Sequence, residues 1–323
     1  MVTDVEKNLV IGIDVGGTGT KIGIVDARGE ILARDEGIAT GSYPTFEAFV
    51  DAMNTVIGRL IKATGSEGRI RGIGVGAPDS NYYTGNIEHA FNLPWKGVLP
   101  LADMLSQKSG IPVYVTNDAN AAAIGEMTYG TAKGMKNFIV ITLGTGVGSG
   151  IVINGQLVYG CDGFAGELGH VTMVRGKEGR LCGCGRHGCL EAYCSATGVA
   201  RTAREILATT NEPSLLRDVK EITSRDVYEA AKQGDHVALK IFDRTGTMLG
   251  EAIADFIAFS SPEAVILFGG LTRAGAFLLD PVKRAVDKNI LHTFKGKTQI
   301  LVSQLRDSDA AILGASALAW EGN

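Results

Sequence analysis

The sequence is poor in proline and tryptophan and has no long apolar run. It contains 8 prolines and 2 tryptophans among 323 residues, and none of its apolar stretches reaches the about 18 residues that a membrane-spanning helix needs. Residues 1–7 also lack the apolar segment of a secretory signal. We therefore expect a cytoplasmic protein with no membrane partner.

A strong charge of either sign is missing as well. The formal net charge of −4 gives the whole molecule no field that attracts nucleic acid, so we expect no nucleic-acid partner. Apolar residues make up 45% of the chain and charged residues 20%, and the mean hydropathy is +0.13, as in packed globular proteins. One hydrophobic core rarely extends over 323 residues. We therefore expect two lobes with a cleft between them.

Cysteine is scarce but crowded. Three of the five cysteines lie at positions 182, 184 and 189, and in a reducing cytoplasm such a cluster favours metal binding over disulfides. The glycines between them let the chain fold back, so that three thiolates and one imidazole can surround a tetrahedral Zn²⁺. His187, inside the cysteine loop, and His170, upstream of it, are both candidates for the fourth ligand. Buried, inert cysteines are the alternative, although this spacing matches no helix or strand face.

Glycine is abundant, with 44 residues, and it marks a repeat. Residues 9–25 form the pattern strand, glycine turn, strand, and residues 138–153 repeat it. Along the rest of the chain, apolar residues at helical spacing alternate with short apolar runs. They predict helices near 46–61, 101–109, 224–233, 236–259 and 307–320, and strands near 70–75, 113–116, 264–268 and 299–302. This alternation indicates an α/β protein made of two related lobes.

The glycine turn after the first strand has the composition of a phosphate-binding loop. Consecutive glycine N–H groups can converge on phosphate oxygens, the hydroxyl of Thr18 adds a donor, and Asp14 can hold Mg²⁺ through water. Gly144-Thr145-Gly146 is the equivalent turn in the second half, and two such turns predict a nucleotide clamp. Each turn alone is equally well explained as a glycine-rich β-turn. The predicted ATP-binding residues are Asp14, Gly16, Gly17, Thr18, Lys21, Gly144, Thr145, Gly146, Gly269 and Gly270.

Asn117-Asp118 lies where a short apolar strand ends and an alanine-rich helix begins. Either residue can cap a helix N-terminus. At the mouth of a cleft, the carboxylate can instead take the proton of a sugar hydroxyl that attacks the γ-phosphate of ATP. The positive end of the helix dipole would hold Asp118 ionised and make it a weak base. Glu167, His170 and Glu191 are further polar residues near the cysteine cluster, either solvated or bonded to the zinc ligands.

Five motifs together resemble the ROK family, named for repressors, open reading frames and kinases. They are Asp14–Lys21, Asn117–Asn120 with Gly125-Glu126, Leu143–Gly150, Gly166–His170 and Cys182–Glu191. The resemblance covers essentially the whole chain, and the glucokinase branch looks most similar. It implies a two-lobed, actin-like (ribonuclease H-like) ATPase fold with a central cleft. It also implies that ATP with Mg²⁺ phosphorylates glucose or a close hexose at O6, and that the protein is a homodimer, as relatives commonly are.

Carried over by position, the resemblance assigns roles to single residues. Asp118 becomes the catalytic base, and His170 becomes the fourth zinc ligand. The implied hexose-binding set is Asn92, Asn117, Asp118, Glu167, His170 and Glu191, and the implied zinc ligands are His170, Cys182, Cys184 and Cys189. The chain departs from many relatives at Pro78-Asp79, where they have Pro-Gly, so the contacts of the loop 76–81 do not follow from the family.

The expected smaller lobe comprises residues 1–118 and 305–323, and the larger lobe, which carries the zinc site, comprises residues 119–304. The motifs do not decide between glucose, mannose, fructose and N-acetylhexosamines, which differ in the orientation of a hydroxyl or in one substituent. A sugar-sensing regulator is the alternative from another class, and with too few residues before Asp14 for a helix-turn-helix it would lack a DNA-binding module. An actin-like ATPase or chaperone would have no use for the cysteine cluster.

Overall fold

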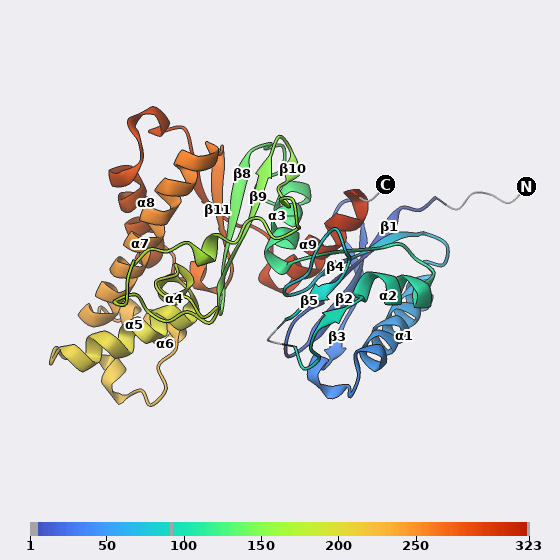
Figure 1. Cartoon of the computed structure of the whole chain (residues 1–323), viewed down its shortest axis with the longest axis horizontal. Coiled ribbons are helices and arrows are strands. Elements are labelled where there is room, and N and C mark those ends of the chain that lie inside the picture. The colour runs from blue at the N-terminus through green and yellow to red at the C-terminus, as the bar shows by residue number, and fades with distance from the viewer. Residues whose placement is uncertain (1–5, 91–92, 322–323) are drawn as a thin grey trace, which may run out of the picture. The chain divides into compact units, whose positions relative to one another are not determined.

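The structure, a computed structural model, describes residues 6–90 and 93–321 (Figure 1). The chain divides into two compact units. Met1–Met135, Gly150–Ala165 and Gln304–Asn323 form the first unit, and Lys136–Ser149 and Gly166–Ser303 form the second. This division counts residues 119–135 and 150–165 with the first unit. The lobe boundaries expected from the sequence, at 118/119 and 304/305, remain a prediction.

Two five-stranded sheets have the same strand order. The order in the first is β3 (Ile31–Ile38), β2 (Thr20–Asp26), β1 (Leu9–Val15), β4 (Ile70–Gly76) and β7 (Val113–Thr116). The order in the second is β10 (Gln156–Leu157), β9 (Val147–Ile153), β8 (Phe138–Leu143), β11 (Ala264–Phe268) and β12 (Gln299–Val302). The central strands correspond, since β1 pairs in parallel with β4 and β8 pairs in parallel with β11. The common order confirms the predicted repeat and the α/β class.

The helices also agree with the sequence pattern where that pattern is strongly periodic. Those of the first unit are α1 (Phe46–Thr64), α2 (Leu101–Ser109), α3 (Asp118–Thr128) and α9 (Asp307–Glu321). Those of the second are α4 (Glu191–Cys194), α5 (Ala196–Thr209), α6 (Ser224–Lys232), α7 (His236–Ser260) and α8 (Ala276–Asn289). The predictions for α1, α2, α6, α7 and α9 are confirmed to within a few residues at the helix ends. Helices α5 and α8 and strand β3 were not predicted.

Helix α1 shows how the pattern becomes structure. Its buried side chains recur every three or four residues, from Phe46 to Leu60, and form one face of the helix. The hydroxyl of Thr45 accepts a hydrogen bond from the N–H of Ala48 at the start of the helix. Gly65 ends the helix with a φ of +60°, a conformation that costs glycine little. The local sequence thus encodes the N-cap, the buried face and the C-terminal end of this helix.

The side chains of β1 alternate between two cores, since successive residues of a strand point to opposite faces of the sheet. Ile11 and Ile13 belong to a cluster that includes buried residues of α1 and α2. Val10, on the other face, packs in a cluster with Ile312 of α9. The first sheet is therefore covered by helices on both faces.

Helix α9 approaches the first sheet closely because glycines face it. A Cβ atom at Gly12 of β1 would lie 2.1 Å from a carbonyl oxygen of α9, and one at Gly74 of β4 would lie 1.8 Å from another. Helix α9 meets α3 in the same way, since a Cβ at Gly125 would lie 2.7 Å from the Cα of Gly314. The backbone of α9 therefore rests directly on the sheet and on α3.

Small residues also bring α7 and α8 together in the second unit, where Figure 1 shows the two helices next to β11. A Cβ at Gly250 of α7 would lie 2.4 Å from the carbonyl oxygen of Val282 in α8. Asp235 caps the start of α7, since its carboxylate accepts a hydrogen bond from the N–H of Ala238 at 2.9 Å. In the described part of the chain, no helix combines the length and the apolar character that crossing a bilayer requires.

Gly74→Ala should destabilise the protein, because a methyl group at this position has no space between β4 and α9. We expect the free energy of unfolding, measured by urea denaturation, to fall by about 2 kcal/mol or more. Gly58→Ala is the matched control, because Gly58 lies within α1 and has no neighbouring atom within 4 Å of its Cβ position. Alanine there should stabilise the protein by up to about 1 kcal/mol. Equal effects of the two substitutions would contradict this account of the packing.

Candidate active site and metal centre

The turn between β1 and β2 is the first predicted phosphate loop. The N–H of Gly16 donates to the carbonyl oxygen of Gly19 at 3.0 Å, while Gly17 and Thr18 are exposed. The turn is therefore closed at its base, and its tip is accessible to a ligand.

Asp14 is the last residue but one of β1 and lies opposite Lys21 of β2 in the strand register, so the two side chains share one face of the sheet. Desolvation and the charge of Asp118 raise the pKa of Asp14 to about 6, and the charge of Lys21 partly offsets them. Asp14, Lys21 and Asp118 therefore interact electrostatically within the first unit. A cation bound beside Asp14 would favour its ionised form.

Asn117, and not Asp118, caps helix α3. The Oδ1 atom of Asn117 accepts a hydrogen bond from the N–H of Asn120 at 2.7 Å, and that of Asp118 accepts from the adjacent N–H of Ala119 at 2.8 Å. Asp118 is exposed to solvent. The capping role is thus filled without Asp118, which leaves its carboxylate available for chemistry.

Desolvation by the surrounding protein raises the pKa of Asp118, and the N–H groups of Ala119 and of Asp118 itself lower it by less. The residue is solvent-accessible all the same, because a carboxylate can reach water while protein replaces part of its hydration shell. The prediction that the helix dipole makes Asp118 a weak base is therefore wrong in direction, since desolvation dominates.

The turn between β8 and β9 is closed like the first one, by a hydrogen bond of 3.0 Å from the N–H of Gly144 to the carbonyl oxygen of Gly146. Glu191, the first residue of α4, accepts a hydrogen bond from the N–H of Val147 at 3.0 Å. A Cβ atom at Gly146 would lie 2.4 Å from the Oε2 atom of Glu191, so any other residue would displace this carboxylate. The second turn and a predicted hexose ligand are therefore in contact.

Gly269 and Gly270 lie beside the strand that leads into the second turn. Gly269 has a φ of +103°, and a Cβ there would lie 2.8 Å from the carbonyl oxygen of Leu143, the last residue of β8. Gly270 opens the 3-10 helix η4 (Gly270–Ala274). The structure thus brings four predicted ATP-binding glycines to one end of the second sheet, namely Gly144, Gly146, Gly269 and Gly270.

The predicted metal ligands lie together in the second unit. One donor atom each from His170, Cys182, Cys184 and Cys189 lies within 4.8 Å of all the others. The Sγ atoms of Cys184 and Cys189 are 3.7 Å apart, and the Sγ atom of Cys182 is 3.7 Å from the Nδ1 atom of His170. A tetrahedral Zn²⁺ with Zn–S bonds of about 2.3 Å separates two sulfur atoms by about 3.8 Å. The cluster fits a metal ion of this size and geometry.

A tight hairpin positions the cysteines. The N–H of Cys182 donates to the carbonyl oxygen of Arg186 at 2.8 Å. Gly188 has a φ of +80°, and a Cβ there would lie 1.8 Å from the carbonyl oxygen of Val174. The Nδ1 atom of His187 lies 2.8 Å from the carbonyl oxygen of Gly179. Of the two candidate imidazoles, His170 therefore joins the cysteines and His187 does not.

The predicted hexose ligands divide between the two units. Within the second, the Nε2 atom of His170 lies 3.8 Å from a carboxylate oxygen of Glu167, and the Sγ atom of Cys182 lies 3.4 Å from one of Glu191. The structure therefore gathers these carboxylates around the metal cluster. Asn117 and Asp118 belong to the first unit, and Asn92 lies outside the described residues.

The backbone of the loop 76–81 shows how Asp79 can stand where many relatives have glycine. Asp79 has a φ of +50°, a left-handed conformation that glycine adopts freely and that aspartate tolerates better than most residues. The Nδ2 atom of Asn81 donates to the carbonyl oxygen of Asp162 at 2.8 Å and ties the loop to the segment 160–163. The Asp79 backbone thus occupies a conformation in which glycine is the usual residue.

Sequence reasoning missed Thr197, which holds the second turn in place. Its hydroxyl donates to the carbonyl oxygen of Thr145 at 2.9 Å, and the N–H of Ala196 donates to that of Gly144 at 2.8 Å. Ser195 is a typical helix N-cap and signals the start of α5. No local pattern identifies the distant turn that this helix start contacts.

The chain is similar to known proteins over nearly its whole length. The ROK family profile matches residues 10–321. A glucokinase of Halalkalibacterium halodurans is 39% identical over 95% of this chain and 94% of its own, and a xylose repressor of Bacillus spizizenii is 28% identical over 96% of this chain and 77% of its own.

Among solved structures, the ROK family glucokinase from Streptomyces griseus in complex with glucose and AMPPNP is similar, with a TM-score of 0.78 and 36% identity. It covers 97% of this chain and 100% of its own. The fold is thus the mixed α/β, actin-like ATPase fold that the motifs implied. The chain belongs to the ROK family.

Proposed function

We propose that the protein is an ATP-dependent hexose kinase that phosphorylates glucose at O6. The observation that supports this most directly is the position of Glu191, whose carboxylate contacts both the residue after the second glycine turn and Cys182 of the metal cluster. The residue proposed to bind a hydroxyl and the turn proposed to bind phosphate are therefore in contact. The relatives named glucokinase and the structure with glucose and AMPPNP support the same pair of substrates.

In the proposed reaction, the O6 hydroxyl of the hexose attacks the γ-phosphorus of ATP, and the bond from this phosphorus to the bridging oxygen of ADP breaks. The O6 proton passes to the carboxylate of Asp118. Because the transition state is loose in most analyses, the hydroxyl needs orientation early and loses its proton late. Bound through Asp14, Mg²⁺ would neutralise phosphate charge.

The side chains assigned to the hexose have the donors and acceptors that sugar hydroxyls require. A carboxylate accepts hydrogen bonds from neighbouring hydroxyls, and an asparagine amide offers both a donor and an acceptor. The proposed set is Asn92, Asn117, Asp118, Glu167, His170 and Glu191. The two glycine turns, with Lys21, Gly269 and Gly270, are assigned to the phosphates of ATP.

The metal cluster is assigned to a structural Zn²⁺. Three thiolates and His170 fill all four positions of a tetrahedral ion and leave none for water. Since the Nδ1 atom of His170 faces Cys182 and its Nε2 atom faces Glu167, one ring serves both the metal and the hexose ligands. We also infer a cytoplasmic homodimer without nucleic-acid or membrane partners.

Initial rates of ADP formation across a panel of hexoses test this function. We expect the highest rate with glucose, lower rates with mannose, fructose and N-acetylhexosamines, and slow hydrolysis of ATP without sugar, because water is a poorly positioned acceptor. Sugar binding without any phosphoryl transfer would instead favour a sugar-sensing regulator. A sugar-independent ATPase activity would favour an actin-like ATPase.

Asp118→Asn should abolish most of the activity and leave the fold intact. Asn117 provides the helix cap, so the melting temperature and ATP binding should stay close to those of the wild type. The kcat should fall by at least the ~10²-fold typical of removing a general base. Asp235→Asn makes the same change at the start of α7, away from the proposed site, and should leave kcat unchanged. A folded Asp118→Asn variant with near wild-type kcat would refute the assignment of the base.

Cys184→Ser should lower zinc content, stability and activity together, because a tetrahedral site that loses one thiolate no longer fixes the hairpin. Zinc per chain is measured by elemental analysis of freshly purified protein, and stability by thermal unfolding. Cys161→Ser is the control, since Cys161 is exposed and lies outside the metal cluster. Wild-type protein that contains no zinc would remove this assignment.

A further inference from the structure

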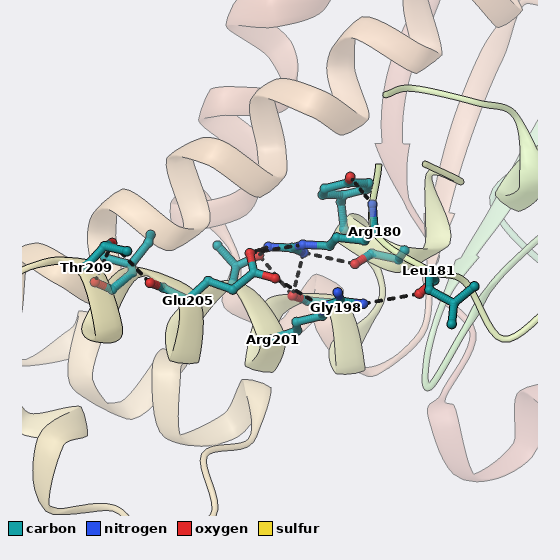
Figure 2. Close-up of polar contacts among 10 residues, drawn as sticks. Arg180, Leu181, Gly198, Arg201, Glu205 and Thr209 are labelled. Atoms are coloured by element: carbon teal, nitrogen blue, oxygen red, sulfur yellow. Dashed lines mark hydrogen bonds and ion pairs between the residues drawn. The ribbon is translucent and has the colours of Figure 1, made fainter. Parts of the chain in front are cut away.

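Arg180 is a buried cation that the proposed reaction does not use. Its side chain is 5% exposed, and its guanidinium group makes as many hydrogen bonds as it has N–H groups. The Nη1 atom donates to the carbonyl oxygens of Ala192 at 2.9 Å and Gly198 at 3.3 Å. The Nε and Nη2 atoms donate to Glu205, and Nη2 also donates to Thr202. Figure 2 shows this network around the guanidinium group.

The backbone of Arg180 belongs to the hairpin that carries the cysteines. Its N–H donates to the hydroxyl of Tyr193 at 2.8 Å, and its carbonyl oxygen accepts from the N–H of Gly188 at 2.8 Å. The guanidinium group lies 4.4 Å from the centroid of the Tyr193 ring. Arg180 therefore joins the hairpin to α4, which contains Ala192 and Tyr193, and to α5, which contains Gly198.

Filling this space with an arginine costs more free energy than filling it with an apolar residue would. Burying a cation costs free energy, and an apolar side chain of similar size is often as stable. The carboxylate that pairs with it, Glu205, is 42% exposed and also pairs with Arg201. An apolar residue cannot, however, bind the carbonyl groups of two helices with one planar fork. The arginine thus fixes the position of α4 relative to α5.

Helix α4 depends on such outside partners because it is only one turn long. Its carbonyl oxygen at Glu191 accepts a backbone hydrogen bond from the N–H of Ser195 at 3.2 Å, but a single turn offers the later carbonyl groups no partners inside the helix. Arg180 binds the carbonyl oxygen of Ala192, and the hydroxyl of Ser195 binds that of Glu191 at 2.7 Å. Any shift of α4 would move the carboxylate of Glu191, its first residue.

We propose that Arg180 is a positioning residue of the hexose site, which holds α4 so that the carboxylate of Glu191 meets a sugar hydroxyl. This inference rests on the proposed hexose kinase function. A purely structural arginine would contribute to stability and leave the hexose kinetics unchanged. A positioning arginine changes the hexose kinetics through Glu191.

Arg180→Lys keeps the positive charge but removes the planar fork, so one amine cannot bind both carbonyl groups with the same geometry. With the best hexose of the panel, we expect kcat/KM to fall by about tenfold to hundredfold, as for other misplaced binding groups. Zinc content should equal that of the wild type, and circular dichroism should show a folded protein at the assay temperature. Arg201→Lys, which changes the exposed partner of the same Glu205, should leave kcat/KM unchanged.

A double variant separates positioning from general stability. If Arg180 acts through Glu191, then Arg180→Lys should lower kcat/KM by no more than about twofold in a Glu191→Gln background, whereas independent effects would multiply. Should Arg180→Lys not fold, Glu205→Gln weakens the same network from its exposed end and takes its place in both measurements.

Three results would overturn the inference: an unchanged kcat/KM in Arg180→Lys, effects that multiply in the double variant, or loss of zinc in Arg180→Lys. Each is measured against an active wild-type enzyme. A wild type that phosphorylates no hexose would instead refute the proposed function itself, so the two failures are distinguishable.

Discussion

The first unit depends on direct contact between the backbone of α9 and the first sheet. Because Gly12 and Gly74 carry no side chains, α9 lies close enough to the sheet for its own glycine to meet Gly125 of α3. Helix α3 begins at Asp118, and Asp14 is the last residue but one of β1. The depth at which this one helix packs therefore sets the relation between the proposed base, Asp118, and the proposed magnesium ligand, Asp14, whose pKa is raised in part by the charge of Asp118.

In the second unit, the proposed site residues lie on short segments. Glu191 lies on a helix of a single turn, and the cysteines lie on a hairpin. Such short segments bury too little apolar surface to fix themselves. Hydrogen bonds to other segments take over this role, namely those from the start of α5 to the second turn and those of the guanidinium group of Arg180. A metal ion bound by the four predicted donors would add a further cross-link.

Much of this architecture can be predicted from the sequence because residues close together in the chain determine it. Regular spacing marks α1 and α7, and composition marks both glycine turns and the cysteine hairpin. Helix α8 escapes prediction because Pro281 lies within it. Spacing alone leaves the fourth metal donor open between His170 and His187, and the family resemblance selects His170, which the structure places with the cysteines. The role of Arg180 escapes for another reason: backbone carbonyl groups supply its partners, and no pattern of side chains records them. The pKa of Asp118 depends likewise on the surrounding protein and not on its helix alone.

The contact between Gly146 and Glu191 has a consequence for how this family diverges. Relatives named as repressors share most of this chain's length. In a lineage that gives up catalysis but still senses a sugar through the carboxylate proposed here, selection for the proposed ATP binding disappears from both turns. The first turn is then free to drift. The glycine equivalent to Gly146 stays under selection, because a side chain there would push the carboxylate aside. Evolutionary loss of the nucleotide site should therefore be uneven, and an intact second turn is poor evidence that a relative is still a kinase.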